Sequence, residues 1–179
     1  YRADLKSMAS ANRLHQGVNL RGHQVWATYE HFQDLLVIRG IPADEDLLDI
    51  VDFFARNSDP NIFKERHALS QSEFRKLIQP LIRTGHIVQD FRGGFRTVMP
   101  NSSVDPTELR KEYLRNMVKE FPIITLKQFM RLAGTPFKPE EIKSVLNSFE
   151  ADGTLIKGFL IEDLHEVCWG RKELLDEAK

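Results

Sequence analysis

The chain has 179 residues, with 25 lysines and arginines against 26 aspartates and glutamates, and a formal net charge of −1. This balance excludes a uniformly basic coat for nucleic acid, so that any site for a polyanion must be a local patch. The single cysteine, Cys168, excludes an internal disulfide framework and a multi-cysteine zinc site. Without an apolar stretch near the ~20 residues of a membrane span, and without a signal pattern, the sequence predicts an intracellular protein, cytoplasmic or nuclear, that makes no membrane contact.

Residues 1–40 are predicted to form an N-terminal helical segment. Leu5 and Met8 fit one helix face, and a clearer helical spacing of apolar residues runs from residue 23 to residue 39. Gly40 then stands where a helix would end.

A strong helix start and a strong hairpin follow one another in the middle of the chain. Ser70 and Glu73 have the spacing of a capping box, and the helix that they begin is expected to end at Gly85. Pro80 lies inside this helix and is expected to kink it or to shorten its last turn. A β-hairpin is predicted for residues 86–98.

The second half of the chain repeats this pattern after a polar linker at residues 99–105. Helices are predicted at residues 107–121, at residues 126–133 and from Pro139 to a stop at Gly153. Residues 154–161 again have the pattern of a β-strand.

Two segments of the chain match each other when they are aligned, residues 74–91 and residues 142–159. Each has an amphipathic stretch of 12 residues that ends before a glycine, followed by an alternating strand that ends in phenylalanine. The offset of 68 residues suits a duplicated small domain. The predicted fold is mainly α with small β-hairpins: tandem winged-helix (helix-turn-helix) units at residues 41–100 and 101–179, preceded by the N-terminal segment.

Two points of this fold stay open at the level of sequence. The second helix of the first unit is weak, and it could be residues 45–56 or a short turn around residues 61–65. The alternative to tandem winged helices is a generic, mostly helical protein with two incidental hairpins.

Catalytic motifs are absent from the sequence. No GxxxxGK[ST], GxSxG, HExxH or CxxC occurs, and Gly93–Gly94 is a hairpin turn rather than a dinucleotide fingerprint. His165 and Cys168 make half a metal site at most, so no metal and no cofactor are predicted, and Cys168 is expected to be buried beside Trp169. The chain is therefore predicted not to be an enzyme; a hydrolase site assembled from dispersed residues is a minor alternative.

Charge is distributed unevenly along the first unit. Residues 44–59 hold six acids and one base, whereas residues 64–99 hold seven bases and three acids. The basic stretch coincides with the helix and the hairpin, or wing, that a winged helix presents to DNA. Phe91 or Phe95 is a candidate for stacking at a strand junction, although strand aromatics of this kind are more often core. The predicted nucleic-acid-binding residues are Lys64, Arg66, Arg75, Lys76, Arg83, Arg92 and Arg96.

The C-terminal residues carry a more particular pattern, FEADGTLIKGF at residues 149–159 followed by residues 166–175. From Val145 to Leu175 the chain resembles the winged-helix segment of large helicase-related (Lhr-type) ATP-dependent helicases. Val167 stands where that family has an aromatic residue, and Trp169 follows the cysteine. Similar wings occur in a family of DNA glycosylases that unhook crosslinks. The resemblance implies that a longer parent protein is an ATP-dependent helicase whose ATPase domains lie outside this chain.

Two functions of different classes follow from these features. The favoured one is a non-catalytic module that binds duplex or junction DNA, as an accessory segment of an ATP-dependent helicase or a repair protein. Residues 136–161 hold three lysines and four acids, so a protein partner is predicted for the second unit instead. The alternative is a winged-helix scaffold for protein interaction in a multi-subunit complex of the transcription type.

Overall fold

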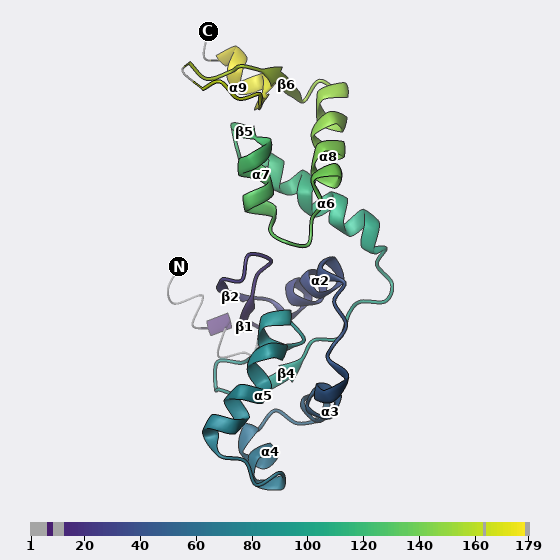
Figure 1. The fold of residues 1–179 in the computed structure, drawn as a ribbon, viewed down its shortest axis with the longest axis vertical. Coiled ribbons are helices and arrows are strands. Elements are labelled where there is room, and N and C mark those ends of the chain that lie inside the picture. Colours follow the sequence, from purple (N-terminus) through teal and green to yellow (C-terminus); the bar gives the residue numbers. More distant parts are fainter. Residues whose placement is uncertain (1–6, 9–12, 163, 178–179) are drawn as a thin grey trace. The chain divides into compact units, whose positions relative to one another are not determined.

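The computed structural model of the protein describes residues 7–8, 13–162 and 164–177, so the prediction for Leu5 lies outside the described residues. The chain divides into two compact units, residues 1–103 and 104–179 (Figure 1). About half of the described residues, 52%, are helical, and the strands form antiparallel sheets of four and three strands. The expectation of a largely helical chain with small β-elements is thus confirmed in this coarse form, with more strand pairing than predicted.

The first unit begins with a β-hairpin where a helix was expected. Strands β1 (His15–Val18) and β2 (Gln24–Ala27) pair antiparallel. In their turn, Asn19 Oδ1 accepts two backbone N–H bonds of 3.0 Å each, and Gly22 adopts a φ of +81° that few other residues tolerate. The expected helix over residues 23–39 therefore begins later, as α2 (Tyr29–Arg39). The helix predicted for residues 23–28 is wrong. The apolar residues there have a spacing that also fits a helix, but they belong to the half-buried strand β2.

Three helices and a second hairpin follow α2. They are the 3-10 turn η1 (Glu45–Leu47) with α3 (Leu48–Arg56), α4 (Pro60–Arg66), α5 (Gln71–Thr84), β3 (Ile87–Gln89) and β4 (Phe95–Thr97). Both candidates for the weak second helix are helical, and α4 is the helix that precedes α5. The capping box of Ser70 and Glu73 is present and Gly85 ends α5, as predicted. Pro80 does not shorten α5; it lies on the exposed side, where water can hydrate the carbonyl that its missing N–H leaves free.

The first four strands form one sheet in the order β2-β1-β3-β4, with helices on both faces. The residues that are direct partners across the four strands are Trp26, Gln16, Gln89 and Phe95. Direct partners share a face of the sheet. Phe95 belongs to the core with α3, α4 and α5, so these helices cover this face. Helix α2 covers the other one: a Cβ on Gly17 of β1 would lie 2.5 Å from the ring of Phe32 in α2.

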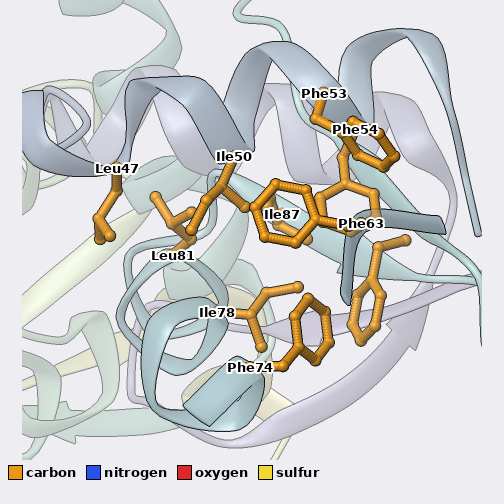
Figure 2. Close-up of a cluster of buried hydrophobic side chains, with 10 residues drawn as sticks. Leu47, Ile50, Phe53, Phe54, Phe63, Phe74, Ile78, Leu81 and Ile87 are labelled. Carbon is orange, nitrogen blue, oxygen red and sulfur yellow. The ribbon is translucent and has the colours of Figure 1, made fainter. Parts of the chain in front are cut away.

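The core of the first unit is rich in phenylalanine (Figure 2). The ring of Phe54 lies 5.1 Å from Phe53, 5.7 Å from Phe63, 6.3 Å from Phe74 and 5.5 Å from Phe95, centroid to centroid. Such ring pairs add ~0.5–1.5 kcal/mol each to the burial of their area. The aliphatic members of the cluster are Leu47, Ile50, Ile78, Leu81 and Ile87.

The second unit has the same order of three helices and a hairpin, with a short strand between its first two helices. Its elements are α6 (Pro106–Lys119), β5 (Ile123–Thr125), α7 (Leu126–Ala133), α8 (Pro139–Ala151), β6 (Leu155–Gly158), β7 (Cys168–Arg171) and α9 (Lys172–Glu177). The sheet order is β5-β7-β6, and the strands β5 and β7 were not predicted. Cys168 is fully buried and Trp169 is 6% exposed, so their predicted burial is confirmed.

Candidate nucleic-acid interface

Helix α5 presents a basic outer face because its apolar residues fall on the opposite side. Its buried residues are Phe74, Ile78 and Leu81. At about 100° per residue, Lys76 and Arg83 point roughly opposite to Phe74, and Arg75 lies to the side. All three basic side chains are exposed, and no hydrogen bond or ion pair engages them within the described part of the chain. These cations are therefore available to an external anion.

The turn between β3 and β4 is organised by Asp90. Its Oδ1 accepts hydrogen bonds from the backbone N–H groups of Arg92 and Gly94, each 2.8 Å long. Gly93 has a φ of +88°, and a Cβ on Gly94 would lie 2.7 Å from Asp90 Oδ2. Arg92 is exposed in this turn, so its guanidinium is carried by a backbone of fixed geometry.

Strand β4 ties this turn to the helices. The N–H of Phe95 donates to the carbonyl of Ser58, just before α4, at 2.8 Å. Thr97 Oγ1 donates to the carbonyl of Val51 in α3 at 2.5 Å. The wing, defined as β3, β4 and their turn, is thus held against the same helices that position α5.

Three of the seven predicted basic residues lie away from the outer face of α5 and from the wing turn. Arg66 lines a shallow pocket together with acidic residues of α3. The Arg96 guanidinium lies 3.8 Å from the centroid of the Tyr29 ring, on the face of the sheet that α2 covers. Lys64 Nζ donates to Gln71 Oε1 at 2.8 Å and links α4 to α5. The predicted residues that remain exposed on the outer face of α5 and in the wing turn are Arg75, Lys76, Arg83 and Arg92.

The two candidate stacking residues of the wing differ in burial. Phe95 is 8% exposed and belongs to the core, so it is not available for stacking. Phe91 is 54% exposed, and its ring centroid lies 6.2 Å from that of Trp26, which is 45% exposed. Trp26 was missed because its segment was expected to be helical. The alternation of residues 24–27 after the Asn19–Gly22 turn was the signal that could have found it.

Two buried histidines of the first unit carry no positive charge near neutral pH. Burial, reinforced by the nearby Arg96, lowers the pKa of His15, whose Nδ1 has no partner among the described residues. Burial likewise lowers the pKa of His86, whose Nδ1 lies 2.8 Å from Thr84 Oγ1. These two histidines therefore do not add to the positive charge of the arginines and lysines.

Metal ligands do not gather in the part of the chain that the structure describes. Within residues 7–8, 13–162 and 164–177, no group of three or more His, Cys, Asp or Glu residues could hold a metal ion. Among the helices of that same part, none is both long and apolar enough to cross a membrane.

Comparison with known proteins yields a similarity of fold. The chain matches no protein-family model and no curated protein. Among solved structures, the Streptomyces sahachiroi DNA glycosylase AlkZ is similar, with a TM-score of 0.66 and 10% sequence identity. The similarity covers 99% of this chain and 57% of the AlkZ chain, so this chain spans little more than half of that protein's length. At this level of identity the likeness shows the fold alone.

This comparison contradicts the prediction that the chain is not an enzyme. The fold that it shares over nearly its whole length occurs in an enzyme, a DNA glycosylase. The lack of ATPase and hydrolase motifs is therefore no ground for excluding catalysis, because sites can be built from dispersed residues on a shared fold. The resemblance of Val145–Leu175 to Lhr-type helicases is not tested by the comparison and stays a prediction.

Proposed function

We propose that this chain binds double-stranded DNA through its first unit, with α5 in the major groove and the wing turn on the phosphate backbone. The outer face of α5 carries this proposal, because Arg75, Lys76 and Arg83 are exposed there without a partner in the described chain. The one acidic residue of α5, Glu73, is held in the capping box at the start of the helix. Arg92 adds a fourth cation from the wing turn.

The distribution of charge around the same unit supports this orientation. The turn η1 and helix α3 carry exposed acids, and residues 44–59 have a local net charge of −5. Phosphates are repelled from that side and attracted to α5, which favours one docking orientation over the others. A net charge of −1 for the whole chain is therefore compatible with DNA binding by one face.

We also propose that both units are winged helices. The order α3-α4-α5-β3-β4 in the first unit is matched by α6-α7-α8-β6-β7 in the second. The exposed side of α8 mixes Lys143 with Glu140 and Glu150, whereas that of α5 is basic. DNA binding is accordingly assigned to the first unit, and the similarity of fold to a DNA glycosylase is in keeping with it.

Fluorescence anisotropy with a labelled 20-bp duplex, titrated between 50 and 200 mM salt, tests the proposal. For B-DNA the plot of log K against log salt has a slope of about −0.9 per neutralised phosphate. Replacing Arg75, Lys76 and Arg83 together by glutamine is expected to make the slope about 2.7 units shallower and to weaken binding uniformly across sequences.

A matched control comes from the second unit, where Lys127, Arg131 and Lys143 are equally exposed. Replacing these three by glutamine changes the net charge by the same amount and is expected to leave the slope within about 1 unit of the wild type. Binding without a salt slope, or an equal loss in both triple variants, would show that α5 is not the DNA-binding element.

A protein-interaction role is the second candidate, favoured by one observation on the second unit. The connection between β6 and β7 exposes Phe159 (72%), Ile161 (44%) and Val167 (39%). Several large apolar side chains exposed in one short connection favour a contact surface. Sedimentation velocity at low and high salt is expected to show a salt-insensitive dimer that Phe159→Ser dissociates. A monomer at every protein concentration would contradict self-association through this surface.

A further inference from the structure

Two aromatic side chains that are 65 residues apart in the sequence form an exposed pair in the first unit. Trp26 lies on β2, the edge strand of the sheet, and Phe91 follows β3 in the wing turn. Their ring centroids are 6.2 Å apart and their planes are inclined by 56°. Because the rings are tilted and not stacked on each other, they leave open ring surface toward solvent, with 45% of Trp26 and 54% of Phe91 exposed.

The pair lies on the face of the sheet that α5 covers, at the wing end. Trp26 is in the same row of direct partners as Gln16, Gln89 and Phe95, and Gln89 is the last residue of β3 before the turn. The ring of Phe95, at the far end of this row, lies 5.8 Å from Phe74 in the first turn of α5. With strands about 4.8 Å apart, Trp26 is about 14 Å from Phe95 across the sheet.

The pair has an exposed cation beside it in the chain, because Arg92 directly follows Phe91. Arg75 and Lys76 directly follow Phe74 in α5, so they lie farther from the pair, beyond the Phe95 end of the row. A solvent-open aromatic ring beside phosphate-binding cations is the arrangement by which proteins hold unpaired nucleotides: the ring stacks on the base and the cations hold the backbone.

We propose that Trp26 and Phe91 form a stacking site for an unpaired nucleobase in the DNA that α5 holds. This proposal rests on the DNA binding proposed above and specifies the form of DNA that the chain prefers, namely a duplex with an unpaired or extruded nucleotide. The backbone that carries the two rings is ordered before binding. Trp26 is held by the register of β1 and β2, and Phe91 by the turn that Asp90 organises. Little ordering is then needed when a base stacks on them.

An exposed apolar side chain elsewhere in the first unit offers a control for the aromatic pair. Ile62 lies in α4, is 50% exposed and belongs neither to the pair nor to α5. Ile62→Ala therefore removes exposed apolar surface without touching Trp26 or Phe91.

The test compares the affinity for a 20-bp duplex with that for the same duplex carrying three unpaired thymidines. The wild type is expected to bind the second DNA more tightly. Stacking of one base is worth ~1–3 kcal/mol, so the double variant Trp26→Ala/Phe91→Ala should bind it roughly 5-fold to 150-fold more weakly. Its duplex affinity and salt slope should stay within about two-fold of wild type. Ile62→Ala should change neither affinity, and Trp26→Phe should keep most of the preference.

Tryptophan fluorescence gives a second readout that does not depend on a destabilising substitution. The chain has two tryptophans, and Trp169→Phe leaves Trp26 as the sole emitter. Emission from Trp26 is expected to be quenched by the DNA with unpaired thymidines and to change little with the intact duplex. Three results would overturn the proposed stacking site. They are a wild type that does not prefer the DNA with unpaired thymidines, a double variant that keeps this preference, and Trp26 emission that this DNA leaves unchanged. Loss of all duplex binding would instead refute the proposed function.

Discussion

Phe63→Ala is expected to destabilise the first unit more than any single surface change. Phe63 is 3% exposed and is the one buried residue of the short helix α4. Its ring centroid lies 5.0 Å from Phe53, 5.7 Å from Phe54 and 6.0 Å from Phe74. A buried Phe→Ala change costs ~3–5 kcal/mol, and three ring contacts of ~0.5–1.5 kcal/mol each put this site near the upper end. The expected loss in the free energy of unfolding is about 5 kcal/mol.

Urea titration followed by tryptophan fluorescence can assign this loss to one unit. In a Trp169→Phe background Trp26 reports on the first unit, and in a Trp26→Phe background Trp169 reports on the second. The Phe63→Ala transition should shift in the first background. Ile62→Ala, a change in the same helix at a side chain that is 50% exposed, should stay within about 0.5 kcal/mol of its background. A loss below about 1 kcal/mol for Phe63→Ala would refute the view that this ring holds α4 in place.

Three further predictions concern a helix cap, an ion pair and a buried histidine. Ser70→Ala should cost the first unit about 1 kcal/mol in urea titration because the cap of α5 is lost, whereas Ser72→Ala on the exposed side should be nearly neutral. Arg110→Met should cost the second unit about 2 kcal/mol by the Trp169 signal, because Arg110 donates to both carboxylate oxygens of Glu141 at 2.8 and 2.9 Å. Burial lowers the pKa of His86 from 6.5, so the unfolded chain takes up the proton first. The first unit should therefore lose stability as pH falls below about 6.5, and His86→Gln should reduce this loss in urea titrations at pH 7.5 and 5.5.

Local signals in the sequence account for the parts of the fold that were predicted well. The capping box at Ser70, the glycine stop at Gly85 and the turn at Gly93 depend on residues within a few positions of each other, and all are found. The first hairpin was missed because its turn signal at Asn19–Gly22 competed with an apolar spacing that also fits a helix. Strand β7 was missed because its partners, β5 and β6, are set by distant pairing that a local pattern does not record.

The candidate site shows the same division between local and long-range information. The exposure of Arg75, Lys76 and Arg83 follows from the 3.6-residue period of α5, so the sequence could predict it. Arg96 lies between the buried residues Phe95 and Thr97 in β4. Because side chains alternate along a strand, the sequence already predicts that Arg96 lies on the opposite face of the sheet from these two residues. The packing of the hairpin against distant helices decides which face of the sheet α5 covers. It therefore also decides that Arg96 points away from α5. The sequence alone could not predict this packing.

The aromatic pair takes this argument one step further. Phe91 alone was a weak candidate for stacking, because a phenylalanine at the end of a strand usually lies in the hydrophobic core. Phe95 in the same hairpin does lie in the core. The two residues differ because the turn that Asp90 organises turns Phe91 outward, where it meets Trp26 from a strand more than sixty residues earlier. A binding site assembled in this way leaves no motif, since each half is an ordinary residue in its own segment. In this chain, absent motifs therefore exclude neither the proposed stacking site nor catalysis.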